Sequence, residues 1–389
     1  MRNELNKVNK SSDAEIKEIT SHSAFRIPHW EKVRRVLVVR LRSIGDTVLT
    51  TPALIALRRF LPDAQIDVLL DDWVVPLLED FDAINHVFPA PTKKTRKAPG
   101  GELVSAKDLF ILRAFTAGLL RQNKYDVAFN LHGGATAGFF TWASRAKYRV
   151  GFKNYRNRFF YNILAPSAAE FWRREKTHSA EQQLALLGWT GVPVADRPKT
   201  RLTVKPELED FAARIFRQYE IDENYPFALI HPVSVFATKQ WAVENFAAVV
   251  KHLYDRGIIS VAVGTKDDLP TLMELFDKSP LAVLLHDKTL PEITAMAAKA
   301  KIFVGNDSGI AHIAAAVNTP SVVVFGSSNV EHWRPWTDAP HEVVTENLPC
   351  APCAGYKCAE FDEPQCIRRI TVERVTAAVE RVLTKSGLG

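Results

Sequence analysis

Three short stretches of the chain end an apolar, strand-like run with residues that can do acid–base or phosphate chemistry. VLVVRLRSIGD ends at Asp46, LIHPVSVFATKQW contains Lys239, and KIFVGNDSGIAH contains Asp307, Ser308 and Gly309. A carboxylate at such a turn suits a general base that takes a proton from a hydroxyl group. A loop lysine offers a point charge to a phosphate, and small residues that open a helix let an anion approach its free N–H groups.

Each of these residues also has a purely structural interpretation. Asp46 and Asp307 both follow a strand-like run and precede a helix-like run, where a carboxylate can simply cap the helix. Lys239 can be an exposed loop lysine. His312, one turn into the helix that follows Asp307, can be a structural histidine. These alternatives remain open at the level of the individual residues.

The turn before Asp46 contains a cation and a glycine. Arg42 is expected to keep the Asp46 carboxylate ionised, and Gly45 is expected to let the backbone turn sharply. Asp46 belongs to the first half of the chain and the helix start at Ser308 to the second. If both face one gap, a general base stands opposite an anion site, and this arrangement is the central functional prediction.

The elements that must position these residues alternate along the chain. Short Val/Ile/Leu-rich runs such as RVLVVRL and SVVVFG alternate with helical stretches, for example residues 47–60 and 243–256, which indicates parallel βαβ units. The pattern breaks around Gly191 to Pro206, where prolines and charges gather. We predict an α/β protein with two Rossmann-like parallel-sheet domains, residues 33–195 and 205–369, that face a central ligand cleft, with a disordered polar extension over 1–32 and an amphipathic helix over 370–385.

Charge and composition limit the possible partners. The net charge of +6 suggests an anionic partner, and the stretch from Arg145 to Asn162 has six cations, interleaved aromatic residues and no acid. This stretch and KKTRK at 93–97 are either solvated surface or sites for phosphate or carboxylate groups, and the aromatic residues could also stack nucleobases. The absence of a span-length apolar run and of a signal peptide predicts a cytoplasmic protein.

Four cysteines, Cys350, Cys353, Cys358 and Cys366, lie close together near the end of the chain. They are compatible with a structural metal site, with reduced thiols or with a redox pair. Motifs of other enzyme classes are missing from the sequence: it has no P-loop, no G-x-G-x-x-G after the first strand, no H-E-x-x-H and no G-x-S-x-G. These absences argue against P-loop NTPases, standard NAD-binding dehydrogenases, zinc proteases and α/β-hydrolases.

Three longer stretches resemble one known family when taken together. RLRSIGDTVLTTPALIALRRFLPDAQIDVLL, VGNDSGIAHIAAAVNTPSVVVFG and EHWRPW are similar to the ADP-heptose:lipopolysaccharide heptosyltransferases of glycosyltransferase family 9, and in detail to its heptosyltransferase III branch. The resemblance spans about residues 33–383. It implies a GT-B fold whose C-terminal helix crosses back to the first domain. It also implies inverting, metal-independent transfer of L-glycero-D-manno-heptose from an ADP-sugar to the lipopolysaccharide inner core, without a cofactor.

The resemblance further implies residue roles. Asp46 corresponds to the base, Lys239 to a contact of the donor phosphates, and four residues to further donor contacts: Asp307, Ser308, Gly309 and His312. The anionic acceptor would meet weaker candidates in the first domain, namely Arg42, Arg145, Lys147, Arg149 and Lys153. A lipid-linked acceptor implies transient docking on the inner face of the cytoplasmic membrane, with no nucleic-acid partner. Two rival functions are a nucleotide-sugar epimerase and a nucleic-acid-binding protein that holds a metal in its cysteine cluster.

Overall fold

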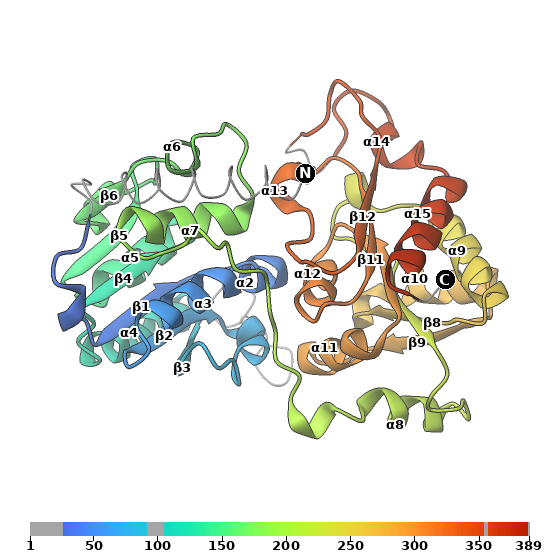
Figure 1. Ribbon diagram of the computed structural model, residues 1–389, viewed down its shortest axis with the longest axis horizontal. Coiled ribbons are helices and arrows are strands. Elements are labelled where there is room, and N and C mark those ends of the chain that lie inside the picture. Colours follow the sequence, from blue (N-terminus) through green and yellow to red (C-terminus); the bar gives the residue numbers. More distant parts are fainter. Residues whose placement is uncertain (1–25, 92–104, 354–356, 388–389) are drawn as a thin grey trace, which may run out of the picture. The chain divides into compact units, whose positions relative to one another are not determined.

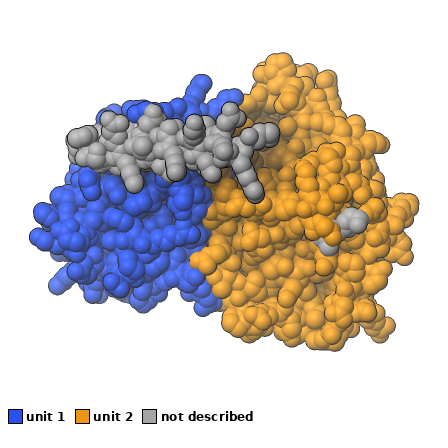
Figure 2. Space-filling model, viewed as in Figure 1, with its two compact units in different colours: residues 1–198 blue, residues 199–389 orange. Residues whose placement is uncertain are grey.

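The computed structural model describes residues 26–91, 105–353 and 357–387, and the chain divides into two compact units (Figure 2). The first unit comprises Met1–Pro198 and the second Lys199–Gly389. Most of the polar N-terminal extension lies outside the described residues, as does KKTRK. Its last part is packed rather than disordered, because Ile27 and Trp30 are buried and the Trp30 indole N–H donates to the Thr190 carbonyl at 2.8 Å.

The first unit is built around a six-stranded parallel sheet (Figure 1). Its strand order is β3-β2-β1-β4-β5-β6. Strands β2 and β3 therefore lie on one side of β1 and strands β4 to β6 on the other, so the strand order reverses between β1 and β4. The strands are β1 (Arg35–Val39), β2 (Gln65–Asp71), β3 (His86–Ala90), β4 (Val127–Asn130), β5 (Tyr148–Phe152) and β6 (Ile163–Ala165). The helices are η1 (Trp30–Lys32), α2 (Ile44–Val48), α3 (Thr51–Phe60), η2 (Asp72–Leu77), α4 (Ala106–Gln122), α5 (Ala135–Ala143), η4 (Arg158–Phe160), α6 (Ala168–Trp172) and α7 (Ser179–Trp189).

The second unit repeats this topology. Its strand order is β12-β11-β10-β7-β8-β9, and the reversal falls between β7 and β10. The strands are β7 (Phe227–His231), β8 (Ile259–Gly264), β9 (Ala282–His286), β10 (Ile302–Asn306), β11 (Ser321–Phe325) and β12 (His341–Thr345). The helices are η5 (Pro206–Leu208), α8 (Phe211–Gln218), η6 (Ala237–Lys239), α9 (Val243–Asp255), η7 (Lys266–Asp268), α10 (Leu269–Lys278), α11 (Leu290–Lys299), α12 (Gly309–Ala316), α13 (Val330–Trp333), α14 (Gln365–Arg368) and α15 (Val372–Lys385).

These sheets explain the continuous apolar runs of the sequence. Every residue of β7 and β10 is buried, as are all residues of β1 except the first, because helices cover both faces of a parallel sheet. Ligands of such sheets bind beyond the carboxyl ends of the strands, where the order reverses. In this chain those positions follow β1 and β4 in the first unit and β7 and β10 in the second.

The helical stretch at residues 47–60 differs from the sequence-based expectation. Residues 47–60 are divided between α2 and α3, because Pro52 lacks a backbone N–H and occupies the first turn of a new helix. The C-terminal helix forms as expected and packs against α9, β10, β11 and β12 of the second unit. Its buried residues, Val375, Ala378, Val379, Val382 and Leu383, join the apolar core that contains Trp241. Within the described residues, no helix is long and apolar enough to span a membrane.

Candidate active site

Asp46 lies in the first turn of α2, at the carboxyl edge of the first sheet. Ser43, not Asp46, is the N-cap residue, because its hydroxyl oxygen accepts the Asp46 backbone N–H at 3.3 Å. The same hydroxyl donates to Oδ2 of Asp46 at 2.9 Å, and the Arg40 guanidinium pairs with Oδ1. Both carboxylate oxygens are therefore held in a defined orientation.

The cation beside Asp46 is Arg40 rather than the expected Arg42. Arg40 directly follows β1 and is buried, and its guanidinium also donates to the Leu131 carbonyl at the end of β4. Arg42 lies further along the turn and is exposed. Arg42 has a left-handed backbone conformation, with φ of 81°, whereas Gly45, where a sharp turn was expected, lies within α2. Arg40 therefore links the residue after β4 to the Asp46 carboxylate, whereas Arg42 is exposed.

The turn after β4 completes this half of the site and was not identified from the sequence. The buried Asn130 side-chain oxygen accepts the backbone N–H groups of His132 at 2.9 Å and Gly133 at 2.8 Å. Gly133 has φ of 78°, and a Cβ there would lie 2.6 Å from the Tyr155 ring. Burial, reinforced by Arg40 and Arg42, lowers the His132 pKa to about 4, so this imidazole is neutral at pH 7. The string NLHGG after an apolar run was the available signal.

The acceptor candidates of the basic stretch are divided between the two edges of the first sheet. Lys153 follows β5 and lies at the same edge as Asp46, whereas Arg145 and Lys147 precede β5 and lie at the amino edge. A five-residue strand separates these edges by roughly 16 Å. Arg149 lies within β5, and its guanidinium donates to the carbonyls of Phe160 at 3.0 Å and Ala146 at 2.9 Å. Arg149 therefore holds neighbouring backbone in place.

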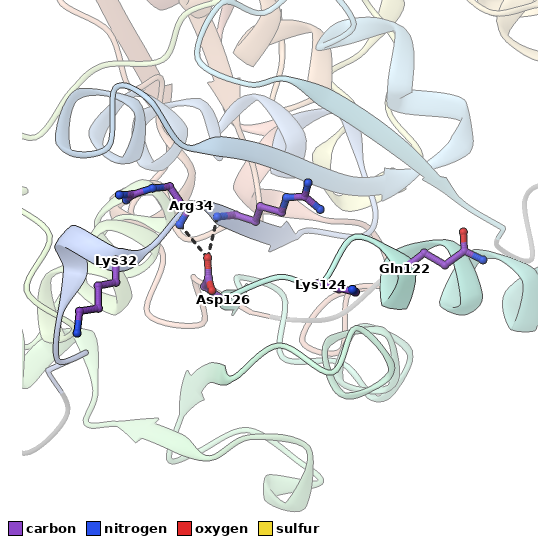
Figure 3. A pocket seen from close by; sticks show the side chains of 6 residues that line it. Lys32, Arg34, Gln122, Lys124 and Asp126 are labelled. Carbon is purple, nitrogen blue, oxygen red and sulfur yellow. Dashed lines mark hydrogen bonds between the residues drawn. The ribbon is translucent and has the colours of Figure 1, made fainter.

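A basic pocket also lies at the amino edge of this sheet (Figure 3). It has a volume of about 430 Å³ and is lined by Lys32, Arg34, Arg35, Gln122, Lys124 and Asp126. The Asp126 carboxylate accepts the backbone N–H groups of Arg34 and Arg35 at 2.8 and 3.0 Å. The pocket is thus formed where β1 and β4 begin, on the opposite edge from Asp46.

The second unit carries its own group of charged residues after β7 and β10. Lys239 ends η6, and its Nζ lies 2.8 Å from Oδ2 of the buried Asp307, which also accepts the Ser328 hydroxyl. Asp307 does not cap a helix, because the N-cap of α12 is Ser308. The Ser308 hydroxyl is buried and makes no hydrogen bond to any described residue, and Gly309 opens the helix. His312 lies buried one turn further along.

Several residues that the sequence did not single out position the Lys239 loop. The buried Asn306 side chain accepts the Trp241 backbone N–H and donates to the Pro232 carbonyl, both at 3.0 Å. A Cβ at Gly326 would lie 2.1 Å from the Thr238 carbonyl oxygen, so only glycine lets the loop approach β11 this closely. The Ser327 hydroxyl donates to the Thr238 hydroxyl at 2.9 Å.

The cysteine segment packs beside this loop, although it is distant in sequence. The Cys353 backbone N–H donates to the Ser327 carbonyl at 2.9 Å, next to the residue that contacts Asp307. All four cysteines are free thiols, and burial, with the other three cysteines nearby, raises the pKa of the Cys366 thiol. Among the described residues, no three His, Cys, Asp or Glu side chains are grouped closely enough to hold a metal ion.

Each unit, taken by itself, therefore carries one group of residues with a defined chemistry. The first offers a carboxylate whose orientation is set by Arg40 and Ser43, which suits proton abstraction. The second offers the Lys239 ammonium beside the start of α12, which suits a phosphate.

Comparison with known proteins gives one consistent answer. Residues 114–362 match the model of glycosyltransferase family 9 (heptosyltransferase). Lipopolysaccharide heptosyltransferase 3 of Escherichia coli is 30% identical over 77% of this chain and 85% of its own length. The enzyme of the same name from strain K12 is 28% identical over 88% of this chain and 96% of its own length. The structure of E. coli ADP-heptose lipopolysaccharide heptosyltransferase II superposes with a TM-score of 0.72 at 20% identity, covering 91% of this chain and 99% of that one.

Proposed function

The chain belongs to glycosyltransferase family 9, the heptosyltransferases, and on this premise we propose that it transfers a heptose from ADP-L-glycero-D-manno-heptose to the inner core of lipopolysaccharide. It is a glycosyltransferase with the GT-B fold. The observation that carries the proposal is the equivalent placement of two complementary charged groups. The Asp46 carboxylate lies at the strand reversal of the first unit, and the Lys239 ammonium at that of the second.

The donor diphosphate binds the second unit in this proposal. Lys239 has three N–H donors, and Asp307 accepts only one of them, so the others can reach phosphate oxygens. The free N–H groups and the dipole of α12 add positive potential beside Ser308 and Gly309. When the sugar–phosphate bond breaks, the ADP leaving group gains negative charge, and these groups stabilise it without a metal ion.

Asp46 acts as the general base on the acceptor hydroxyl. Its Oδ1 faces Arg40 and its Oδ2 faces Ser43, so the carboxylate is oriented before the acceptor arrives. The hydroxyl oxygen attacks the anomeric carbon on the face opposite the leaving diphosphate, its proton passes to Asp46, and the anomeric configuration inverts. Arg42 and Lys153, at the same edge, are the cations best placed for acceptor phosphates, whereas Arg149 supports the backbone.

The acceptor also suggests where the enzyme works. Lipopolysaccharide precursors are lipid-linked, and this chain carries a net charge of +6. We therefore place it in the cytoplasm, peripherally and transiently on the inner face of the cytoplasmic membrane, where anionic lipids attract basic proteins.

A donor panel tests the proposed function. The purified protein is incubated with delipidated core oligosaccharide and, in turn, with ADP-L-glycero-D-manno-heptose, ADP-glucose and GDP-mannose, and the product mass is measured. We expect one heptose to be added from the first donor only. Preferential transfer of another sugar would replace the donor assignment, and conversion of the donor without acceptor would indicate an epimerase instead.

A further inference from the structure

Large apolar side chains are concentrated on the outer surface of α4. Phe110 is 73% exposed and Phe115 is 66% exposed, and Ile111 between them is also exposed. Positions 110, 111, 114, 115 and 118 lie on one side of a helix, and all are exposed. The opposite side, with Leu109, Thr116 and Leu120, is buried. The helix therefore presents an apolar stripe to solvent in addition to the stripe that packs on its own unit.

The neighbouring elements carry further exposed aromatic side chains. Helix α4 packs against α5, and α5 packs against η4. Trp142 of α5 and Phe159 of η4 are 51% and 73% exposed. Phe160 links them, with its ring centroid 6.4 Å from that of Trp142 and 4.3 Å from that of Phe159. We call the exposed residues Phe110, Ile111, Leu112, Phe115, Trp142 and Phe159 the α4–α5 face.

The charges around the α4–α5 face have a strong bias. Residues 106–122 and 135–162 together contain nine Lys or Arg side chains and a single acid, Asp108. Protein–protein interfaces are depleted of charge at their centre and have a polar rim. An excess of one sign next to exposed Phe and Trp is instead typical of surfaces that insert apolar side chains among anionic lipids.

The direction of α4 relates this face to the reacting carboxylate. The helix ends at Gln122 and leads into β4, so its C-terminal end lies at the amino edge of the sheet. Its N-terminal half, with Phe110 and Ile111, runs back toward the edge where Asp46 lies, because helices of βαβ units run antiparallel to their strands, and Phe115 lies at its middle.

We propose that the α4–α5 face docks on the anionic surface of a phospholipid bilayer, with the exposed Phe and Trp side chains among the lipids and the flanking cations on their phosphates. This inference rests on the proposed function, because a lipid-linked acceptor gives the enzyme a reason to bind there. The face holds the first unit at the membrane, and the isolated sugar acceptor does not need it.

Vesicle co-sedimentation tests the docking surface. The full chain is mixed with phosphatidylethanolamine–phosphatidylglycerol vesicles or with phosphatidylcholine vesicles. The double variant Phe110→Ser/Phe115→Ser is compared with a matched control, Tyr254→Ser/Met273→Ser, which removes two exposed apolar side chains from α9 and α10. We expect the Phe variant to partition onto anionic vesicles at least about tenfold less than wild type and the control to bind like wild type.

A second readout separates this proposal from the function itself. Transfer to delipidated acceptor should be equal in wild type, the Phe variant and the control, while transfer to vesicle-embedded acceptor should fall only in the Phe variant. If wild type transferred heptose to neither acceptor, the proposed function would be overturned, but the vesicle result would remain valid. Equal vesicle binding by all three proteins would overturn the docking surface. The docking surface would also be overturned if light scattering showed a dimer for wild type and a monomer for the Phe variant, because the face would then bind a second copy of the chain.

Discussion

The two units use the same strand order and the same turn positions to present opposite charges. In the first, the arginine of the Arg40–Asp46 pair is the more buried partner, with 9% of its side chain exposed against 15% for the carboxylate. In the Lys239–Asp307 pair of the second unit, the acid is the more buried partner. Its side chain is 6% exposed, against 24% for the lysine side chain. In the function we propose, the first turn offers a base and the second a phosphate-binding cation, although the supporting topology is the same.

In each pair, the more buried partner supports the less buried one, to which we assign a role in the reaction. Arg40 and Asp307 each orient the group that is available to a ligand. Removing either partner leaves a charge in a partly buried position without compensation, which costs stability as well as function. Variants must therefore separate the loss of a reacting group from the loss of its support.

The largest effect is expected for Asp46→Asn. The amide keeps the shape of the side chain but cannot accept a proton, so kcat should fall by about 10²- to 10⁴-fold. ADP binding, measured by calorimetry, should be nearly unchanged, because the donor is assigned to the other unit. If the melting temperature and the activity fall together, Asp46 is a structural residue of the α2 turn.

Lys239→Ala should affect donor binding by the second unit. Loss of a charge-assisted contact should weaken ADP binding by about 10- to 100-fold and raise the KM for the donor. The variant also leaves Asp307 buried without its cation, so the double variant Lys239→Ala/Asp307→Asn is the control. The double variant should recover the melting temperature but not ADP binding. Donor kinetics equal to those of wild type would remove Lys239 from the site.

Arg40→Met and Arg42→Ala together distinguish the supporting arginine from the exposed one. Arg40→Met should lower kcat by about tenfold or more and lower the melting temperature, because it removes the group that orients Asp46. Arg42→Ala should leave the free energy of unfolding within about 0.5 kcal/mol of the wild-type value. It should raise only the acceptor KM, by a few-fold. A reversed order of these effects would contradict the assignment of Arg40. Steady-state kinetics and thermal melts of both variants provide the comparison.

The smallest effect concerns pH and involves a histidine in each unit. Burial lowers the pKa of His132 and of His231 from 6.5 to about 4. As the pH falls from about 6.5 to about 4, the unfolded chain binds protons that the folded chain does not, so stability falls. Each histidine contributes a slope of up to about 1.4 kcal/mol per pH unit.

Urea unfolding between pH 4 and 7 measures this slope. His132→Gln and His231→Gln should each flatten it, whereas His286→Gln should not, because His286 is exposed at the end of β9. A slope that neither buried-histidine variant changes would assign the acid sensitivity to other groups.

The predictable part of the fold came from periodicity. The apolar runs indicated the parallel strands, and the small residues after KIFVG indicated a helix start, because these features depend on neighbours in sequence. The division of residues 47–60 into two helices was predictable from Pro52, but the apolar spacing continues across it. The N-terminal anchor at Trp30 was missed because its partner, Thr190, is distant along the chain.

The sequence by itself determined the fold class, the family and the candidate chemistry of Asp46, Lys239 and Asp307, because residue types and local spacing carry that information. Only the tertiary structure decided which arginine pairs with Asp46 and which acid pairs with Lys239. It also placed Lys153 at one sheet edge and Arg145 at the other. These outcomes depend on which strands are neighbours and where each strand ends, and such long-range pairings are made only when the sheet assembles.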